Sequence, residues 1–344
     1  MRERTIEISA IEHYKNKYIC FAKNINMLFE LDIDGETRVL CMLPEDRKNR
    51  LVEKILVSGD RVFMIPLHGK CVYEFDLKQE SLNIIELQQG ETVKYFKFFN
   101  GFIFGECLYL IGSYYPSIVK ININDRNINE IPIYESKLEL QKKINDCFAR
   151  KSIVVRDHKI YIPSALDNEV AIYDTDTDTY SWEKIGNDTN RFSGIAWDGE
   201  SFWFSPRNCS TIVRWIPNVL IDEIDISPWY KDDKNFAGIL CRDNKIYLYS
   251  LNSEYSVVYD VESKKAEKIF TGAECFFENL DGTIFNQFKD GKLFIYGEEE
   301  NKIININPDG IYETISNRDD KWSYYFNESR TFDLSAFIGE VLKC

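Results

Sequence analysis

The sequence predicts an all-β fold assembled from repeated four-stranded units, and three observations support this. First, short apolar runs alternate with polar turns along the chain. Second, successive units begin 42 to 52 residues apart. Third, seven apolar pairs, each separated by 12 residues, mark the units: Ile19 and Leu31, Phe63 and Phe75, Tyr109 and Ile121, Tyr161 and Tyr173, Trp203 and Trp215, Tyr247 and Tyr259, Phe294 and Ile306. Such repeats are typical of propeller blades, so we predict a seven-bladed β-propeller.

The first three units occupy residues 5–43, 53–87 and 95–133, and each supplies four predicted strands. Turn residues separate these strands. Asp34-Gly35 predicts the last hairpin of the first unit, because a tight hairpin needs positive φ. Gly101 and Gly105 predict a bulged or double turn in the third unit.

The longest connection, residues 135–151, follows the third unit. Its apolar residues have a partial helical spacing, which predicts one short helix: Leu138, Leu140, Ile144 and Phe148. An insertion between blades lies at the rim of one face. It is either a surface decoration or a lid over the central channel, and the sequence leaves both open.

The last four units occupy residues 152–185, 193–226, 237–270 and 275–316. Asp-Gly or Asp-Asn predicts the first hairpin of the final three units, at Asp198-Gly199, Asp243-Asn244 and Asp290-Gly291. A short polar residue follows the second anchor of six units. We interpret these residues as turn residues at the blade periphery, not as a carboxylate site: Asp32, Asp76, Asn122, Asp174, Asp260 and Asn307.

The propeller is expected to span residues 1–316, and residues 317–344 form a C-terminal extension. The spacing of its last part predicts an amphipathic helix, with Asp333 or Thr331 as N-cap. One face of this helix carries Leu334, Phe337, Ile338, Val341 and Leu342. We expect this face to pack on the propeller, and contact with a partner or a second copy is the alternative.

Composition limits the function. The chain has 344 residues, 44% of them hydrophobic, and a net charge of −14. This charge argues against binding nucleic acid or an anionic membrane. The N-terminus carries charges throughout, so no signal peptide is predicted. Nine scattered cysteines without a C-x-x-C motif indicate a reducing environment. We therefore predict a soluble cytoplasmic protein.

Residues 170–185, VAIYDTDTDTYSWEKI, together with the repeat length resemble kelch-type propeller repeats. The Gly-Gly pair of kelch repeats is replaced here, for example by Ile65-Pro66, Ile111-Gly112 and Pro163-Ser164. No Trp-Asp pair closes the units as in WD40 repeats. The resemblance implies the propeller fold and carries over no functional residue, because one fold hosts many functions.

Loops between second and third strands, and loops between blades, gather on one face of a propeller. Several basic and aromatic residues of this acidic chain fall in these loops: Arg150, Arg191, Arg207, His68, Lys70, Tyr114, Tyr115 and Trp229. Arginine offers paired donors to carboxylates and phosphates. We therefore predict recognition of a small anionic ligand, a peptide or a protein partner at this face.

The alternative is an enzyme of the lyase, hydrolase or cyclase type, with His68 as base and Tyr114 or a cysteine nearby. The candidate cysteines are Cys71 and Cys209. His13 and His158 are predicted on the opposite face, so we expect neither a multi-histidine metal site nor a cofactor. The sequence contains no G-x-S-x-G, H-E-x-x-H or P-loop motif.

Overall fold

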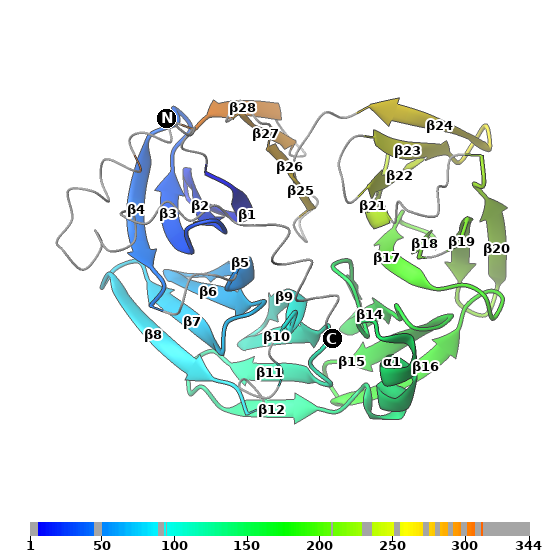
Figure 1. Cartoon of the computed structure of the whole chain (residues 1–344), viewed down its shortest axis with the longest axis horizontal. Coiled ribbons are helices and arrows are strands. Elements are labelled where there is room, and N and C mark those ends of the chain that lie inside the picture. The colour runs from blue at the N-terminus through cyan, green and yellow to red at the C-terminus, as the bar shows by residue number, and fades with distance from the viewer. Residues whose placement is uncertain are drawn as a thin grey trace.

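The computed structural model of the chain describes residues 6–44, 50–88, 93, 95–207, 209–228, 236–250, 255–270, 275–278, 283–287, 292–296, 301–306 and 311. Within these ranges the strands form seven four-stranded antiparallel sheets, and each sheet uses four consecutive strands. The sheets stand around a common centre, with the first strand inside and the fourth at the rim (Figure 1). The prediction of an all-β fold built from four-stranded sheets is confirmed.

The first three sheets contain the following strands: β1 (Ile8–Tyr14), β2 (Lys17–Ala22), β3 (Met27–Leu31), β4 (Thr37–Met42); β5 (Val52–Ser58), β6 (Arg61–Pro66), β7 (Cys71–Asp76), β8 (Ser81–Glu86); β9 (Phe98–Phe104), β10 (Cys107–Gly112), β11 (Ile118–Asn122), β12 (Ile128–Ile131). The inner strands β1, β5 and β9 contact one another in this order.

The remaining four sheets contain these strands: β13 (Val154–Arg156), β14 (Lys159–Pro163), β15 (Glu169–Asp174), β16 (Thr179–Lys184); β17 (Phe192–Trp197), β18 (Phe202–Pro206), β19 (Thr211–Ile216), β20 (Leu220–Asp225); β21 (Phe236–Arg242), β22 (Lys245–Ser250), β23 (Tyr255–Asp260), β24 (Lys265–Phe270); β25 (Cys275–Glu278), β26 (Ile284–Gln287), β27 (Lys292–Tyr296), β28 (Asn301–Asn305). The end of the sheets that carries the loops between second and third strands is called the loop face. The opposite end, with the first hairpins, is the hairpin face.

The anchor pairs of the first six sheets lie in the second and third strands, as predicted. In the last sheet the prediction is wrong, because Phe294 lies in the third strand, β27, and Ile306 follows the fourth, β28. The reason is visible in the sequence. Residues 275–297 contain two turn pairs, Asp281-Gly282 and Asp290-Gly291. Two turns divide this stretch into three strands, not two.

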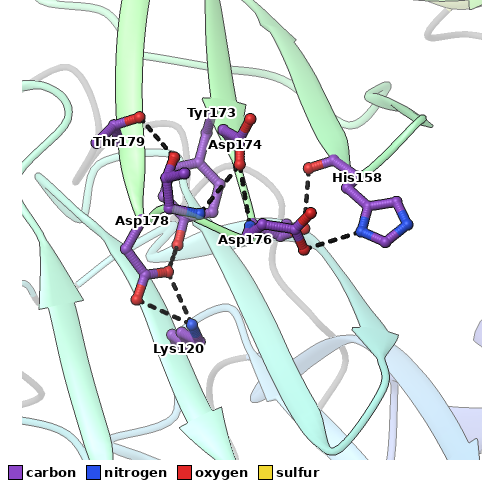
Figure 2. Close-up of polar contacts among 9 residues, drawn as sticks. Lys120, His158, Tyr173, Asp174, Asp176, Asp178 and Thr179 are labelled. Atoms are coloured by element: carbon purple, nitrogen blue, oxygen red, sulfur yellow. Dashed lines mark hydrogen bonds and ion pairs between the residues drawn. The ribbon is translucent and has the colours of Figure 1, made fainter.

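The residues after the second anchors close turns, as predicted. Asp174 Oδ1 accepts hydrogen bonds from the backbone N–H groups of Asp176 (3.0 Å) and Thr177 (3.1 Å), which Figure 2 shows. Backbone N–H groups also bind the side-chain oxygens of Asp32, Asp76, Asn122 and Asp260. Asn307 lies outside the described residues. These side chains are therefore satisfied turn residues at the periphery.

Five of the inner strands contain a β-bulge near their first residue. At each bulge, one extra residue has no opposed residue in the second strand. We call these residues the bulge positions: Ser9, Glu53, Phe99, Ser193 and Ala237. A bulge increases the local twist and reorients its side chain. In the third sheet the bulge is thus at Phe99, while Gly105 supplies the turn with φ 57°.

The connection between the third and fourth sheets forms the predicted short helix. It consists of a 3₁₀ turn, η1 (Glu135–Lys137), and α1 (Leu138–Ile144). Asn145 ends the helix in the left-handed conformation, with φ 56°. The chain then returns to the body, where the Phe148 N–H donates to Ser113 O (2.7 Å) and the Ala165 N–H donates to Phe148 O (2.9 Å).

Side chains fix this insertion to the fourth sheet. Lys137 is buried and pairs with Asp167 (Nζ–Oδ2, 2.6 Å) and with Glu169. Its ammonium also lies 4.5 Å from the centre of the Trp182 ring. The stretch is therefore a packed part of the fold.

The first and last sheets share one hydrophobic core, which includes Ile8, Leu31, Phe285, Leu293 and Ile304. β1 contacts β25, although no strand is exchanged between these sheets. Apolar packing therefore joins the first and last sheets of the described chain.

No helix among the described residues is long and apolar enough to cross a membrane. The predicted extension at residues 317–344, including its amphipathic helix, lies outside the described residues. Of the strand predicted at residues 311–316, only Ile311 is described.

Candidate functional site

Four aromatic residues and His68 form one group on the loop face. His68, from the β6–β7 loop, lies 4.8 Å from Phe96 and 5.6 Å from Tyr95 between ring centres. Phe96 in turn lies 5.9 Å from Phe99 and 6.1 Å from Tyr114. Tyr95 is 48% exposed, and the other members are half-buried. We call these five residues the aromatic cluster.

Phe96, at the middle of this cluster, has a left-handed backbone with φ 49°. This conformation is rare for a bulky residue and is unfavourable. Hydrogen bonds from the β10–β11 loop hold it in place, because the Tyr114 N–H donates to Phe96 O (3.1 Å) and the Ser113 N–H donates to Lys97 O (2.7 Å). Strain of this kind is concentrated at functional sites.

Two arginines adjoin the aromatic cluster, and we call them the arginine pair. The Arg150 guanidinium lies 5.7 Å from the centre of the Phe99 ring. Arg150 Nη2 is 3.7 Å from Asp146 Oδ1, which is too long for a hydrogen bond. Arg207 Nε donates to Asp146 Oδ2 (2.9 Å), and its Nη2 donates to the same oxygen. The Arg207 side chain is only 7% exposed, so this is a buried ion pair.

The electrostatics of the site follow from this geometry. Burial raises the pKa of Asp146, but the hydrogen bonds and charge of Arg207, together with the charge of Arg150, outweigh it and hold that pKa below its usual range. Burial also raises the pKa of Tyr114 to about 12, so its phenol stays protonated. Asp146 therefore remains ionised and compensates one arginine of the two.

A second polar network continues from Arg150 through the next residue, Lys151. Lys151 Nζ lies 2.5 Å from Glu53 Oε1, and Arg50 Nη2 lies 2.8 Å from Glu53 Oε2. Lys54 Nζ donates to Asn100 Oδ1 (2.9 Å), and Asn100 Nδ2 donates to Lys151 O. Glu53 occupies a bulge position, and its side chain is 3% exposed.

Basic residues thus outnumber acidic residues in this part of a chain whose net charge is −14. The acids of the two networks are Glu53 and Asp146. The bases that pair with these acids or adjoin them among the described residues are Arg50, Arg150, Lys151 and Arg207. The local excess of positive charge favours an anion.

His68 is uncharged at neutral pH. Burial, together with the charges of Lys97 and Arg50 and against an opposite effect of Glu53, lowers the pKa of its imidazole to about 4. Its Nδ1 is buried and has no hydrogen-bond partner among the described residues.

The structure brings part of the predicted site together. Arg150, Arg207, His68 and Tyr114 all belong to the connected groups described above. Lys70 is exposed in the same loop as His68. Arg191 is half-buried, and its carbonyl accepts a hydrogen bond from the Arg207 N–H (2.8 Å). The Arg191 side chain makes no hydrogen bond or ion pair with another described residue.

Tyr115 does not join this group. It is fully buried, packs on Phe98 (4.8 Å between ring centres), and donates from its hydroxyl to Glu130 at the rim (2.5 Å). Trp229 lies outside the described residues.

Sequence reasoning missed Phe96, Phe99 and Asp146. The two phenylalanines lie in the run YFKFFNGF, the start of the first predicted hairpin of the third unit. Its high aromatic content was the available signal. Asp146 follows the insertion helix directly, and a carboxylate near predicted arginines is an obvious partner for them.

The hairpin face carries a different polar group, shown in Figure 2. His158 Nδ1 lies 2.8 Å from Asp176 Oδ1, and this hydrogen bond raises the pKa of His158. Lys120 and Tyr173 both donate to Asp178 Oδ1, at 2.7 and 2.5 Å. These contacts join the third and fourth sheets. Among the described residues, no group of three or more His, Cys, Asp or Glu could hold a metal ion.

Comparisons with known proteins support the fold. No protein-family model matches the chain, and no curated protein is similar in sequence. Virginiamycin B lyase from Staphylococcus aureus is similar in structure, with a TM-score of 0.58, 13% identity, and coverage of 89% of this chain and 97% of the lyase. BamB from Moraxella catarrhalis has a TM-score of 0.55, 12% identity, and coverage of 84% and 85%. Both are β-propellers, and the predicted propeller fold is confirmed.

Proposed function

We propose that this propeller is a recognition protein that binds a small anionic ligand at the aromatic cluster and the arginine pair. The observation that carries the proposal is the state of Arg150. Its guanidinium is half-buried beside Phe99, and its Nε is buried without a hydrogen-bond partner among the described residues. An unpaired donor in a half-buried guanidinium is costly, and an anion on the remaining N–H groups of Arg150 would offset that cost.

The surroundings support a small ligand. Arg207 is occupied by Asp146, so Arg150 is the member of the arginine pair with free donor capacity. A peptide or protein partner at the same face would contact Tyr95 and Lys70, which are exposed. Binding of a peptide or protein partner is the second form of the proposal. The experiment below distinguishes it from binding of a small anion.

The test is a titration of the full chain by thermal shift and calorimetry with citrate, phosphate and a short acidic peptide. Specific binding raises the unfolding midpoint with ligand concentration. We expect Arg150→Gln to abolish the shift. Arg156→Gln is the matched control, because Arg156 lies on the hairpin face above the Trp197 ring (4.0 Å). A shift with the peptide alone would favour the peptide partner, and no shift with any probe would contradict the proposal.

The enzyme alternative uses His68 as a general base. A base works best with a pKa near the working pH, and the imidazole pKa of about 4 is far below it. Tyr114 stays protonated, and Cys71 is buried. These properties suit hydrogen bonding to a ligand better than proton abstraction.

We also infer that the seven sheets are the blades of one closed ring. The shared core of the first and last sheets supports this, as does the close approach of Gly35 to Asn305. The kelch-like subclass and the cytoplasmic location stay predictions. Residues 317–344 are proposed to pack on this ring.

A further inference from the structure

We propose that the ligand is an aromatic carboxylate that lacks an amino group, with its ring on Phe96 and Phe99 and its carboxylate on Arg150. The inference deepens the proposed function and rests on it.

The ring is inferred from the arrangement of Phe96, Phe99 and Arg150. Phe99 adjoins both, because its ring centre lies 5.9 Å from the Phe96 ring centre and 5.7 Å from the Arg150 guanidinium. Both phenylalanines are half-buried, so part of each ring is available. Aromatic pairs gain extra stabilisation at centre distances of about 4.5–7 Å. A molecule that contacts this surface and Arg150 together combines an apolar group with an anion, and an aromatic ring gains the extra stabilisation on Phe96 and Phe99.

The carboxylate is inferred from Asp146. This side chain shows that a carboxylate is compatible with the arginine pair, and Arg207 binds it through two nitrogens. Arg150 approaches it only to 3.7 Å, and its Nε has no hydrogen-bond partner among the described residues. Since a guanidinium has five N–H donors in one plane, Arg150 can bind a second carboxylate while Asp146 stays on Arg207.

The absence of an amino group is inferred from the surrounding charge. Glu53 already pairs with Arg50 (2.8 Å) and Lys151 (2.5 Å), and Asp146 already pairs with Arg207. An ammonium group on the ligand would therefore meet cations, while both carboxylates of these two networks are taken. Aromatic amino acids are therefore excluded, and the corresponding acids without nitrogen fit.

Four matched probes test the class: 3-phenylpropanoate, 3-cyclohexylpropanoate, 3-phenylpropanamide and L-phenylalanine, each titrated into the full chain by calorimetry. We expect 3-phenylpropanoate to bind most tightly. 3-Cyclohexylpropanoate, which lacks the aromatic ring, should bind about two- to tenfold more weakly than 3-phenylpropanoate. 3-Phenylpropanamide, which lacks the negative charge, should bind at least about tenfold more weakly than 3-phenylpropanoate. L-Phenylalanine should bind more weakly than 3-phenylpropanoate.

Variants assign each preference to a residue. Phe99→Leu should remove the preference for phenyl over cyclohexyl, and Arg150→Gln should remove the preference for carboxylate over amide. Phe104→Leu is the control, because Phe104 contacts His158 on the hairpin face and should change neither preference. Circular dichroism checks that each variant is folded.

The outcomes separate this inference from the proposed function. Equal binding of the phenyl and cyclohexyl acids, or tight binding of L-phenylalanine, would overturn the ligand class while anion binding stands. Stabilisation by citrate or phosphate without binding of any aromatic probe would do the same. If the amide binds as tightly as the acid and no anion stabilises the chain, both proposals fail.

Discussion

Asp146 and Arg207 form the ion pair on which the loop-face site depends. Their side chains are 15% and 7% exposed, so neither charge is well solvated. Breaking such a pair on one side leaves a buried charge without compensation, whereas replacing both partners removes both charges. The pair connects the end of the insertion to the β18–β19 loop, and it therefore fixes the position from which Arg150 approaches Phe99.

We predict that Arg207→Met lowers the free energy of unfolding by about 3 kcal/mol, because Asp146 is left buried and unpaired. The double variant Asp146→Asn with Arg207→Met should be clearly more stable than the single variant. Urea unfolding followed by tryptophan fluorescence measures both. Equal destabilisation in the single and double variants would show that lost packing, not charge, causes the effect.

The low pKa of His68 predicts a loss of stability in acid. The unfolded imidazole binds a proton near pH 6.5, while the folded one stays neutral until about pH 4. The contribution is therefore complete above pH 6.5 and is lost as the pH falls to 4, by up to about 3 kcal/mol. Unfolding midpoints across this window should fall less steeply in His68→Asn.

His158→Gln is the control for this measurement, because the pKa of His158 is raised by Asp176. Its contribution has the opposite sign: it is present below pH 6.5 and is lost as the pH rises through the folded pKa. If His68→Asn retains the full acid slope, other groups cause the loss of stability.

At this scale the sequence predicted which loops carry the site but not which side chains meet there. Tyr114 and Tyr115 are neighbours in one loop, yet one joins the aromatic cluster and the other packs on Phe98. Successive residues in extended backbone point to opposite sides, and the register of a loop is not readable from its composition. Phe96 depends on a positive φ, for which a phenylalanine gives no sequence signal.

At the scale of the elements, the third-to-fourth-strand hairpin of the first sheet contacts the last sheet. Gly35 has φ 89°, and a Cβ built on it would lie 2.3 Å from the backbone oxygen of Asn305. Backbone cannot move aside as a flexible side chain can. This glycine is therefore required both by its own turn and by its neighbour.

We predict that Gly35→Ala lowers the free energy of unfolding by at least about 2 kcal/mol, because conformational strain and a backbone clash add together. Gly59→Ala is the matched control. Gly59 also has positive φ (60°), but its Cβ would have no atom within 4 Å. Gly59→Ala should lower the free energy of unfolding by about 1 kcal/mol. Similar losses in both variants, measured by urea unfolding, would argue against close packing of the first and last sheets.

Most elements were predictable because turn chemistry and strand patterning agree in the first six sheets. The insertion helix was also predictable from its apolar spacing. The burial of Lys137 beside Asp167 was not predictable. The prediction for the last sheet was wrong because it used one Asp-Gly turn, whereas the sequence contains two. The positions of the bulges could not be predicted, and the one expected at Gly101 or Gly105 lies at Phe99, since bulges depend on pairing with the second strand and their residues share no chemical type.

For the whole molecule, the shared core of the first and last sheets predicts where stability is concentrated. Phe285 is 1% exposed in this core, and we expect Phe285→Ala to cost about 3–5 kcal/mol. Ile303→Ala in the same sheet is the control, because Ile303 is 57% exposed and should change stability little. Thermal and urea unfolding test both. A minor effect of Phe285→Ala would mean that the two sheets are not joined through this core.

The bulge positions have a consequence for how such a molecule can evolve or be redesigned. Ser9, Glu53, Phe99, Ser193 and Ala237 occupy the same structural place in five sheets, although they differ in size, charge and polarity. A bulged residue has no directly opposed residue in the second strand, so the register of the backbone hydrogen bonds does not depend on its identity. Substitutions at this ring of positions can therefore diversify specificity in small steps while the scaffold is inherited unchanged.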